Sequence, residues 1–518
     1  MENIKSGLVL RNACAITLDP RRPQARTIYI RNGRILKVSG KEIDTKLAGA
    51  AQVIDCRGRT VIPAFHDAHC HVMAYAESLL NIDLSPKSVK SIEDIVRKIR
   101  EAAATLPAGA WIRCAGYNEF YLAEKRHPSS RDLDRATAGH PVKLTHRSGH
   151  AHVLNSAAMA VAGINGNSEE PPGGMIERDL ETGEPNGLLF GMGPYLAGII
   201  PPAGQAELEE AVSRAGRTLL SLGITTVQDA SQGNGPERWA RFLDWKRRGL
   251  FAPRTVMMRS PQETGSPQGL EAHNSHETSL LRGAVKIMLD EVRGSLNPSQ
   301  KELNRLVLEI HKSGRQAAIH AVEETTVNAA ATALEQALKQ RPGKDHRHRL
   351  EHCSVCTPAA AARLLRLGAI VATNPAFIYY SGERYLYTVP PEQLRHLYAI
   401  RDMLSAGLRV AAGSDAPVAG PDPLMGIYAA VTRLSENGRK VVPSQAVSTL
   451  EALKLYTVGA AYSCFLESSL GSLSKGKYAD LAMLSGNPLS ADPAELKNLR
   501  VEMTLMEGKV VYSKAPIL

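Results

Sequence analysis

The sequence predicts an α/β protein built around a (β/α)8, or TIM, barrel, with a large insertion after the first barrel strand and a small β-sandwich formed by both termini. Through the middle of the chain, short apolar runs rich in β-branched residues alternate with amphipathic stretches, which is the pattern of βα units around a parallel sheet. We count eight such runs, the number of strands in a closed barrel. Both ends of the chain instead consist of short strand-like runs and turns.

The two β-rich ends are predicted to form one composite domain. Near the amino terminus, Asn32-Gly33 is a turn that favours a tight hairpin between the apolar runs on either side. Near the carboxyl terminus, Glu507-Gly508 separates two further strand-like runs. We therefore expect residues 1–60 and 470–518 to fold together as the β-sandwich, and residues 61–469 to form the barrel.

The expected barrel strands are separated by one very long interval and several short ones. The eight strands are Thr60–Phe65, Thr225–Gln228, Arg254–Met258, Ala284–Leu289, Gln316–Ile319, His348–Glu351, Ala369–Thr373 and Arg409–Ala412. Helices are expected between them, among others at Gln300–Ser313, Glu324–Lys339, Pro358–Leu367 and Pro391–Ala406. Residues 80–220 form the insertion. Because the insertion follows a strand at the catalytic end of a barrel, we expect it to be a lid that shapes the substrate pocket.

Composition excludes several classes of protein. Hydrophobic residues make up 43% of the 518 residues, and the 7 cysteines are scattered, as in a chain with a large core and reduced thiols. The net charge is +10, but lysine and arginine are spread along the chain, so we expect no nucleic-acid partner. No run approaches the roughly 18 apolar residues of a membrane span, and the first residues lack the apolar segment of a signal peptide. We expect a soluble cytoplasmic protein with a small-molecule substrate; the sequence leaves open whether it forms a homo-oligomer.

His69 and His71 are the most informative pair of residues in the chain. They follow the first expected strand, with Cys70 between them. Alternate side chains of an extended segment share a face, so both imidazoles are expected to point the same way. Neutral imidazole is a common ligand of zinc and similar metals, so the pair supplies half of a metal site.

Four further polar residues lie at or near the carboxyl ends of other expected strands. Lys286 lies within the fourth strand and His320 ends the fifth. His352 ends the sixth strand, and Asp415 follows the eighth. The carboxyl ends of barrel strands meet at one rim, so these side chains are expected to converge with the two histidines of the first strand.

Each of these residues also has a structural interpretation. A single strand-end histidine such as His320 is more often a satisfied polar residue than a ligand, and Gly413–Asp415 could be a turn or a helix cap. Lys286 could form an ion pair with Asp290 or Glu291. Structural roles do not easily produce six such residues in order at the ends of five strands, so we predict a metal site.

The motifs resemble those of the amidohydrolase superfamily of metal-dependent hydrolases, over nearly the whole chain. Within it, the chain is similar to the large branch that includes N-substituted formamide deformylase and the YtcJ-like proteins. The motifs that carry the resemblance are Asp67–His71, Ser148–Ser156, Gly223–Asp229, Val285–Ile287, Arg349–His352, Gly413–Pro417 and Pro423–Tyr428.

This resemblance implies a barrel with one or two divalent metal ions, commonly zinc. It implies that His69, His71 and Asp415 hold the first ion, and that His320 and His352 hold the second. A carboxylated Lys286 and a hydroxide would bridge the two ions. The implied reaction is attack of a metal-bound hydroxide on a non-peptide C–N bond of an amide, formamide or cyclic amide. Asp415 would act as general base and then general acid. Asp415 and His352 are the expected catalytic residues.

The substrate is less well defined by the sequence. His150 matches a position that the branch uses near the pocket, and Tyr117, Asn118, Arg147, Tyr379 and Tyr380 are expected on loops that could face the site. The chain departs from the branch at Asp290-Glu291 and at Glu323-Glu324, which puts the substrate and the modification of Lys286 in doubt. Two alternatives are left open: a deaminase of a heterocyclic amine, and a non-catalytic scaffold that keeps the barrel.

Overall fold

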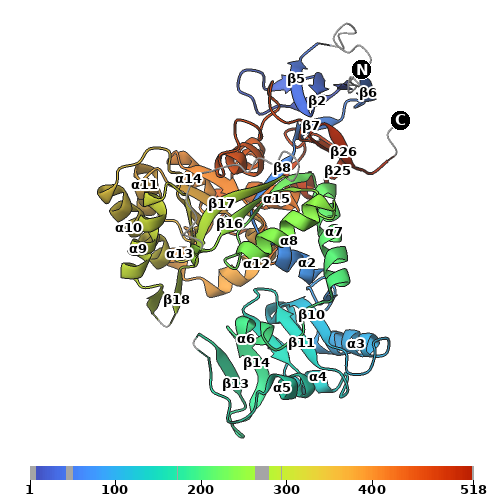
Figure 1. Cartoon of the computed structure of the whole chain (residues 1–518), viewed down its shortest axis with the longest axis vertical. Helices are drawn as coiled ribbons and strands as arrows, with labels where there is room; N and C mark the ends of the chain where they lie inside the picture. Colours follow the sequence, from blue (N-terminus) through green and yellow to red (C-terminus); the bar gives the residue numbers. More distant parts are fainter. Residues whose placement is uncertain (1–6, 42–50, 172, 263–278, 293, 516–518) are drawn as a thin grey trace. The chain divides into compact units, whose positions relative to one another are not determined.

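The structure, a computed structural model, describes residues 7–41, 51–171, 173–262, 279–292 and 294–515. Residues 1–6, on which the expected lack of a signal peptide partly rests, lie outside the described part, as do residues 516–518 of the predicted composite domain. The chain divides into two units (Figure 1). One contains Met1–Val72 and Ala215–Leu518, and the other contains Met73–Arg214.

The first unit contains an α/β barrel, as the sequence predicts. Its eight strands pair in parallel with their neighbours in sequence order. The strands are β8 (Phe65–Cys70), β15 (Ile224–Asp229), β16 (Arg254–Arg259), β17 (Leu280–Ile287), β20 (Ala317–Ala321), β21 (Arg349–His352), β22 (Ile370–Thr373) and β23 (Arg409–Ala412). Helices of the barrel include α8 (Pro236–Arg247), α9 (Gln300–Lys312), α10 (Glu324–Gln340), α11 (Pro358–Arg366), α12 (Ala376–Thr388) and α15 (Pro423–Thr432) (Figure 1).

Capping side chains specify where barrel helices begin. At the start of α9, the Ser299 side chain accepts a hydrogen bond from the N–H of Glu302. At the start of α11, Thr357 accepts one from the N–H of Ala360, and Pro358 occupies the first turn. These local signals explain why both helices begin close to the residues that the sequence predicts.

Backbone hydrogen bonds join the segment after β23 to β8. The N–H of Asp415 donates to the carbonyl of His69 at 2.7 Å, and the N–H of His71 donates to the carbonyl of Ala416 at 2.9 Å. Gly413 makes this approach possible, because a Cβ at this position would lie 2.4 Å from the backbone nitrogen of His69. The barrel therefore closes where three of the predicted metal ligands lie.

The first barrel strand is not the one that the sequence predicts. The expected strand Thr60–Phe65 corresponds mostly to β7 (Thr60–Pro63), which pairs with β24 (Leu481–Leu484) outside the barrel. The barrel strand β8 follows directly and pairs with β15. An apolar-run criterion overlooks β8 because several of its buried side chains are polar. As a result, His69 lies within a barrel strand and not after it.

The two ends of the chain form two further sheets in the first unit. The four-stranded sheet has the order β5 (Arg34–Ser39), β4 (Thr27–Arg31), β1 (Leu8–Arg11) and β6 (Gln52–Asp55). The six-stranded sheet contains strands from both termini, in the order β26 (Lys509–Ser513), β25 (Val501–Met506), β24, β7, β2 (Cys14–Ile16) and β3 (Gln24–Ala25). Ile28 and Ile54 of the first sheet and Val61 and Leu481 of the second belong to one hydrophobic cluster.

A buried ion pair connects the barrel to the six-stranded sheet. Nη1 of Arg254 in β16 lies 2.8 Å from Oδ2 of Asp480, and both side chains are 4% exposed. We expect Asp480→Ala to lower the free energy of unfolding by about 3 kcal/mol, because it leaves a buried guanidinium with Glu507 as its remaining carboxylate partner. Equilibrium unfolding in urea measures this change.

The control for this prediction is an exposed ion pair. Arg305 and Glu309 lie four residues apart on α9 and contact each other at 2.8 Å. Because exposed pairs contribute little, Glu309→Ala should change the free energy of unfolding by about 0.5 kcal/mol or less. Equal losses in the two variants would show that the Arg254 pair does not stabilise the fold as proposed.

The second unit is built on a six-stranded mixed sheet. The strand order is β13 (Met175–Arg178), β14 (Pro185–Phe190), β12 (Ala151–Leu154), β11 (Val142–His146), β10 (Ile112–Tyr117) and β9 (Ile82–Asp83). The helices of this part of the chain are α2 (Val72–Ser78), α3 (Ile92–Ala103), α4 (Ser130–Asp134), α5 (Ser156–Ala162), α6 (Gly193–Ala197) and α7 (Gln205–Ser221). The unit covers most of the predicted insertion 80–220, and its role as a lid stays a prediction.

One predicted helix is interrupted. Pro391–Ala406 contains two short helices, α13 (Pro391–Leu394) and α14 (Ile400–Ser405). Between them, Tyr398 has φ 46° and its N–H donates to the carbonyl of Ser354 at 2.7 Å, so a tertiary hydrogen bond replaces helical pairing. No helix in the described ranges combines the length and the apolar character needed to span a bilayer.

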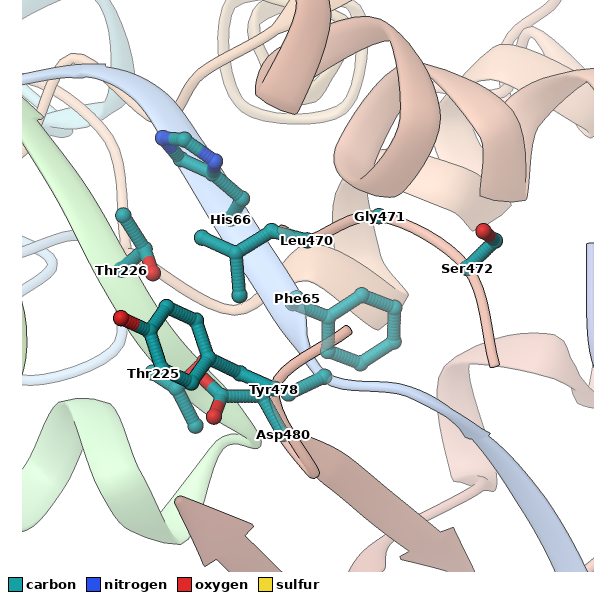
Figure 2. A pocket seen from close by; sticks show the side chains of 10 residues that line it. Phe65, His66, Thr225, Thr226, Leu470, Gly471, Ser472, Tyr478 and Asp480 are labelled. Atoms are coloured by element: carbon teal, nitrogen blue, oxygen red, sulfur yellow. The ribbon is translucent and has the colours of Figure 1, made fainter. Parts of the chain in front are cut away.

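A small cavity lies at the end of the barrel where the strands begin (Figure 2). Its lining includes Phe65 and His66 of β8, Thr225 of β15, and Tyr478 and Asp480 from the carboxyl-terminal segment. Its volume is about 10 Å³, which is room for roughly one water molecule. This cavity is too small for an organic substrate. The substrate is expected at the opposite rim of the barrel, where the strands end.

Candidate metal centre

Three of the predicted ligands meet at the carboxyl-terminal rim of the barrel. His69 lies near the end of β8, His71 follows that strand, and Asp415 follows β23. Oδ1 of Asp415 lies 3.0 Å from Nε2 of His71 and 3.4 Å from Nε2 of His69. The ligand atoms of the three side chains all lie within 4.8 Å of one another.

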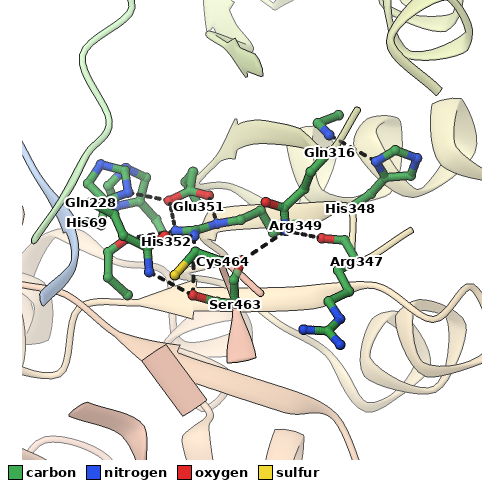
Figure 3. Close-up of polar contacts among 12 residues, drawn as sticks. His69, Gln228, Gln316, Arg347, His348, Arg349, Glu351, His352, Ser463 and Cys464 are labelled. Carbon is green, nitrogen blue, oxygen red and sulfur yellow. Dashed lines mark hydrogen bonds and ion pairs between the residues drawn. The ribbon is translucent and has the colours of Figure 1, made fainter. Parts of the chain in front are cut away.

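Hydrogen bonds at Nδ1 orient two of the site histidines. Nδ1 of His69 contacts the carboxylate of Glu351, and Nδ1 of His352 lies 2.7 Å from Oδ1 of Asn374 (Figure 3 labels His69, Glu351 and His352). Both partners can only accept, so each imidazole donates from Nδ1. Nε2 of each ring is then the nitrogen with a free lone pair, which is the arrangement found in histidines that bind metals.

The loop after β15 supports His71. Asp229, the last residue of β15, accepts hydrogen bonds from the N–H groups of Val72 and Ser231, each at 3.0 Å. The hydroxyl oxygen of Ser231 in turn lies 3.1 Å from Nδ1 of His71. One buried carboxylate thus fixes the backbone beside His71 and the loop that contacts its ring.

The donor set fits a divalent cation. Nε2 of His69 and Oδ1 of Asp415 are buried, yet neither forms a hydrogen bond of acceptable geometry with any residue in the described ranges. Imidazole nitrogens and a carboxylate oxygen are ligands that zinc prefers. A cation held by His69, His71 and Asp415 would satisfy both buried atoms.

His320 and His352 form a second pair of imidazoles beside the first. Their ring centroids are 4.5 Å apart, and the centroid of His352 is 4.7 Å from that of His69. Burial lowers the pKa of His352 to about 4 and lowers the pKa of His320 well below its ordinary value. Both rings are therefore neutral at pH 7, the form that binds metals. Nε2 of His320 lies 3.5 Å from Oδ1 of Asp290.

Lys286 lies in β17 and is almost completely buried, with 1% of its surface exposed. Burial lowers the pKa of its amine, although Glu351 and Asp415 act in the opposite direction. A lysine with a lowered pKa is more often neutral, and a neutral amine is the nucleophile that reacts with carbon dioxide. The position of Lys286 is therefore compatible with the carboxylation that the resemblance implies.

Two site residues have a left-handed backbone conformation. The φ angle is 68° at His352 and 58° at Asp415. Residues other than glycine seldom adopt this conformation, which costs on the order of 1–3 kcal/mol and is concentrated at functional sites. The hydrogen bond from the N–H of Asp415 to His69 helps to hold one of these conformations in place.

Comparison with known proteins identifies the family. Residues 52–512 match the amidohydrolase family. The chain belongs to this family. The match confirms the resemblance that the sequence motifs indicate.

Two curated relatives are similar to this amidohydrolase over almost their whole length. It is 29% identical to the protein YtcJ of Bacillus subtilis (strain 168), over 95% of this chain and 97% of the relative. It is also 29% identical to N-substituted formamide deformylase of Arthrobacter pascens, over 98% of each protein. The crystal structure of an uncharacterized metal-dependent hydrolase from Pyrococcus horikoshii has the same fold, with a TM-score of 0.73 at 21% identity over 94% of this chain and 99% of that one.

The sequence does not identify the residues that support the candidate metal ligands of the amidohydrolase. Glu351, Asn374 and Ser231 each contact a site histidine, and none of them was expected to have a role. A signal for Glu351 was available: Arg349 and Glu351 are opposite charges two positions apart, hence on one face, in a fully buried strand. Such a pair in a barrel strand indicates a specific buried interaction and not a solvated surface.

Most predicted substrate residues lie in the second unit. Tyr117 ends β10 in the hydrophobic core and its hydroxyl lies 3.0 Å from Nδ1 of His127, so it is not on a loop as predicted. Asn118 is buried and accepts a hydrogen bond from the N–H of Phe120. Arg147 is half-buried and His150 is exposed, both in the turn between β11 and β12. The contacts of Tyr117 and Asn118 named here are with residues of the same unit. A role in substrate binding stays a prediction for all four residues.

The remaining predicted substrate residues belong to the first unit. Tyr379 and Tyr380 lie in α12, and the prediction that they lie on a loop is wrong. The preceding Asn374-Pro375 suggests a loop, but the helix begins directly after the proline. The rings of the two tyrosines are 5.1 Å apart, and Tyr379 is 8% exposed. A role in substrate binding stays a prediction for Tyr379.

The acidic departures from the family pattern have a structural explanation in one case. Glu323 precedes α10 and Glu324 begins it. Negative charge is favourable at the amino terminus of a helix because the backbone N–H groups there are unpaired. These carboxylates therefore stabilise α10, and their presence does not require a role in catalysis.

Proposed function

We propose that this amidohydrolase cleaves a non-peptide C–N bond of a small amide, formamide or cyclic amide with the help of a divalent metal ion, which we take to be zinc. The observation that carries the proposal is the convergence of His69, His71 and Asp415 at the rim of the barrel. Two of the converging atoms, Nε2 of His69 and Oδ1 of Asp415, are buried and have no hydrogen-bond partner in the described ranges. The family match and the name of the Arthrobacter relative, a formamide deformylase, support the bond type.

The residues divide into ligands and a proton carrier. His69, His71 and Asp415 would hold one ion, and His320 and His352 would hold a second, with carboxylated Lys286 between them. A bound ion would lower the pKa of a water molecule and polarise the substrate carbonyl. Asp415 accepts a proton from the attacking water and returns it to the leaving nitrogen, so that the C–N bond breaks to give an acid and an amine. His352 would be a ligand of the second ion and, with Asp415, one of the two catalytic residues.

Other parts of the proposal rest on composition and fold. We assign residues 1–60 and 470–518 as the β-sandwich and residues 80–220 as the insertion that shapes the substrate pocket. All seven cysteines are free thiols, which supports a reducing compartment such as the cytoplasm. The partner we propose is a small-molecule substrate, with no nucleic acid and no membrane; a homo-oligomer is compatible with the fold.

A substrate panel tests the reaction class. Protein loaded with zinc would be assayed against N-substituted formamides, hydantoins, lactams and amino-purines, with formate, amine and ammonia measured separately. We expect release of an amine and an acid from one of the first three classes. Release of ammonia from an amino-purine would instead show a deaminase, and no turnover of any class by metal-loaded protein would favour a scaffold.

A separate measurement tests the carboxylation of Lys286. Protein incubated with 13C-labelled bicarbonate should give a carbamate carbonyl signal in its 13C NMR spectrum. The signal should be absent in Lys286→Met, whereas replacement of the exposed Lys339 by methionine should leave it unchanged. If wild-type protein saturated with zinc gives no such signal, the bridging carboxylate is wrong and the site holds its metal through the histidines and Asp415 alone.

A further inference from the structure

A completely buried arginine lies behind the metal centre. Arg349 is 0% exposed and begins β21 (Figure 3). Its Nε donates to Oε1 of Glu351 at 2.5 Å, and its Nη2 donates to Oε2 of the same carboxylate at 2.8 Å. The guanidinium thus binds both oxygens of the carboxylate that contacts His69. This two-point contact fixes the plane of the Glu351 carboxylate.

The same guanidinium also holds the strand that carries His69. Nη2 donates a second hydrogen bond to the carbonyl of Ala68 at 2.8 Å, one residue before His69 in β8. Strands β21 and β8 are not neighbours. Where the barrel closes between β23 and β8, strands β22 and β23 still separate β21 from β8. Arg349 therefore reaches across the barrel interior and fixes His69 from two sides, through its backbone and through its ring partner.

The remaining donors of Arg349 are also used. Nη1 donates to Oε1 of Gln228 at 2.5 Å and contacts Oγ of Ser463 at 3.4 Å. The amide nitrogen of Gln228 donates to Oγ of Ser463 at 2.9 Å and to the carbonyl of Ala460 at 3.0 Å, which fixes the orientation of this amide. The five N–H groups of the guanidinium thus have five acceptors. A lysine ammonium has three donors and cannot reproduce this planar arrangement.

We propose that Arg349 is a positioning residue that sets the ring orientation and tautomer of His69 and thereby the affinity of the site for its metal ion. The inference rests on the proposed function, because it assigns a role toward the ion that His69 would hold. With Arg349 in place, Glu351 accepts from Nδ1 of His69, and Nε2 faces Asp415. Without Arg349, Glu351 loses both of its guanidinium hydrogen bonds and no longer has a fixed orientation.

A second buried arginine in the barrel provides the matched control. Arg254 is 4% exposed, lies in β16 and also binds carboxylates, with Nη1 2.8 Å from Asp480 and Nη2 2.6 Å from Glu507. Its partners belong to the carboxyl-terminal segment and not to the metal centre. If Arg349 only stabilises the fold, Arg349→Lys and Arg254→Lys should therefore have the same consequences.

The experiment measures zinc affinity and stability on the full-length chain. Zinc dissociation constants would be determined by competition with a chromophoric chelator, and unfolding midpoints by thermal denaturation of the metal-free proteins. We expect Arg349→Lys to weaken zinc binding by about 10- to 100-fold, the usual effect of losing an outer partner of a metal ligand. Both variants should lower the unfolding midpoint by similar amounts. Arg254→Lys, however, should change the zinc dissociation constant by less than about twofold.

A double variant separates positioning from general damage. Glu351→Gln keeps the size of the side chain but replaces one carboxylate oxygen with an NH2 group, so the side chain can no longer accept hydrogen bonds at both positions from Arg349 and from Nδ1 of His69. It should therefore weaken zinc binding to an extent similar to that of Arg349→Lys. Because both residues act through the same hydrogen bond, the double variant should bind zinc little worse than either single variant.

Three results would overturn the inference: wild-type zinc affinity in Arg349→Lys, equal loss of affinity in Arg254→Lys, or additive losses in the double variant. A failure of the proposed function looks different, because in that case the wild-type protein itself would bind no zinc.

Discussion

Replacing Asp415 with asparagine is expected to lower kcat by about 10²- to 10⁴-fold while most of the bound metal is retained. The change removes the proposed carrier of the proton from water to the leaving nitrogen, but it keeps an oxygen that could still approach the proposed ion. Asparagine suits this position because Asp415 has φ 58°, and asparagine tolerates the left-handed conformation better than most residues. Steady-state kinetics and metal content of the purified variant measure the two effects.

The control for this variant is the same substitution at Asp402. Asp402 lies in α14, and its carboxylate accepts a hydrogen bond from Nε2 of Gln445 at 2.7 Å. Because Asp402 does not belong to the candidate metal centre, Asp402→Asn should retain wild-type kcat. Full activity in Asp415→Asn would remove Asp415 from the reaction. A loss of metal as large as the loss of activity would show that Asp415 is a ligand and not the proton carrier.

Replacing His352 is expected to have the second large effect. His352 ends β21, its Nδ1 is held by Asn374, and its ring lies between those of His69 and His320. We expect His352→Asn to reduce the metal content and to lower kcat/KM by more than the 10- to 100-fold that loss of an outer partner costs. Asparagine is chosen over alanine because φ at this position is 68°.

A histidine just before the same strand provides the comparison. His346 precedes β21, whereas His352 ends it, and Nε2 of His346 lies 2.9 Å from the carbonyl of Leu367. His346→Asn should lower thermal stability but leave metal content and kcat/KM near wild-type values. If His352→Asn retains both its metal and its activity, the second pair of histidines has no role in the reaction.

The sequence predicts the barrel well because the relevant signals are local. Apolar runs mark the buried strands, and caps such as Ser299 and Thr357 mark the helix starts, so α9 and α11 lie within a residue or two of their predicted bounds. The convergence of His69, His71 and Asp415 follows from one rule, that barrel strands end at a common rim. No knowledge of side-chain packing is needed for that step.

The sequence fails where tertiary contacts replace local signals. The strand β8 contains the polar residues His66, Asp67 and His69, so the apolar run before it is mistaken for the barrel strand. The burial of Tyr117 in the core of the second unit is missed for a similar reason. Nothing in the local sequence shows that His127 lies beside its hydroxyl. The partners of the ligands, such as Glu351 and Asn374, can be recognised only once the strands are placed side by side.

The most direct test of the account is an anomalous difference map from crystals of the zinc-loaded protein, with data collected at the zinc absorption edge. The account predicts a peak among Nε2 of His69, Nε2 of His71 and Oδ1 of Asp415 at the rim of the barrel. A map from zinc-loaded crystals with no peak among these three atoms would contradict it.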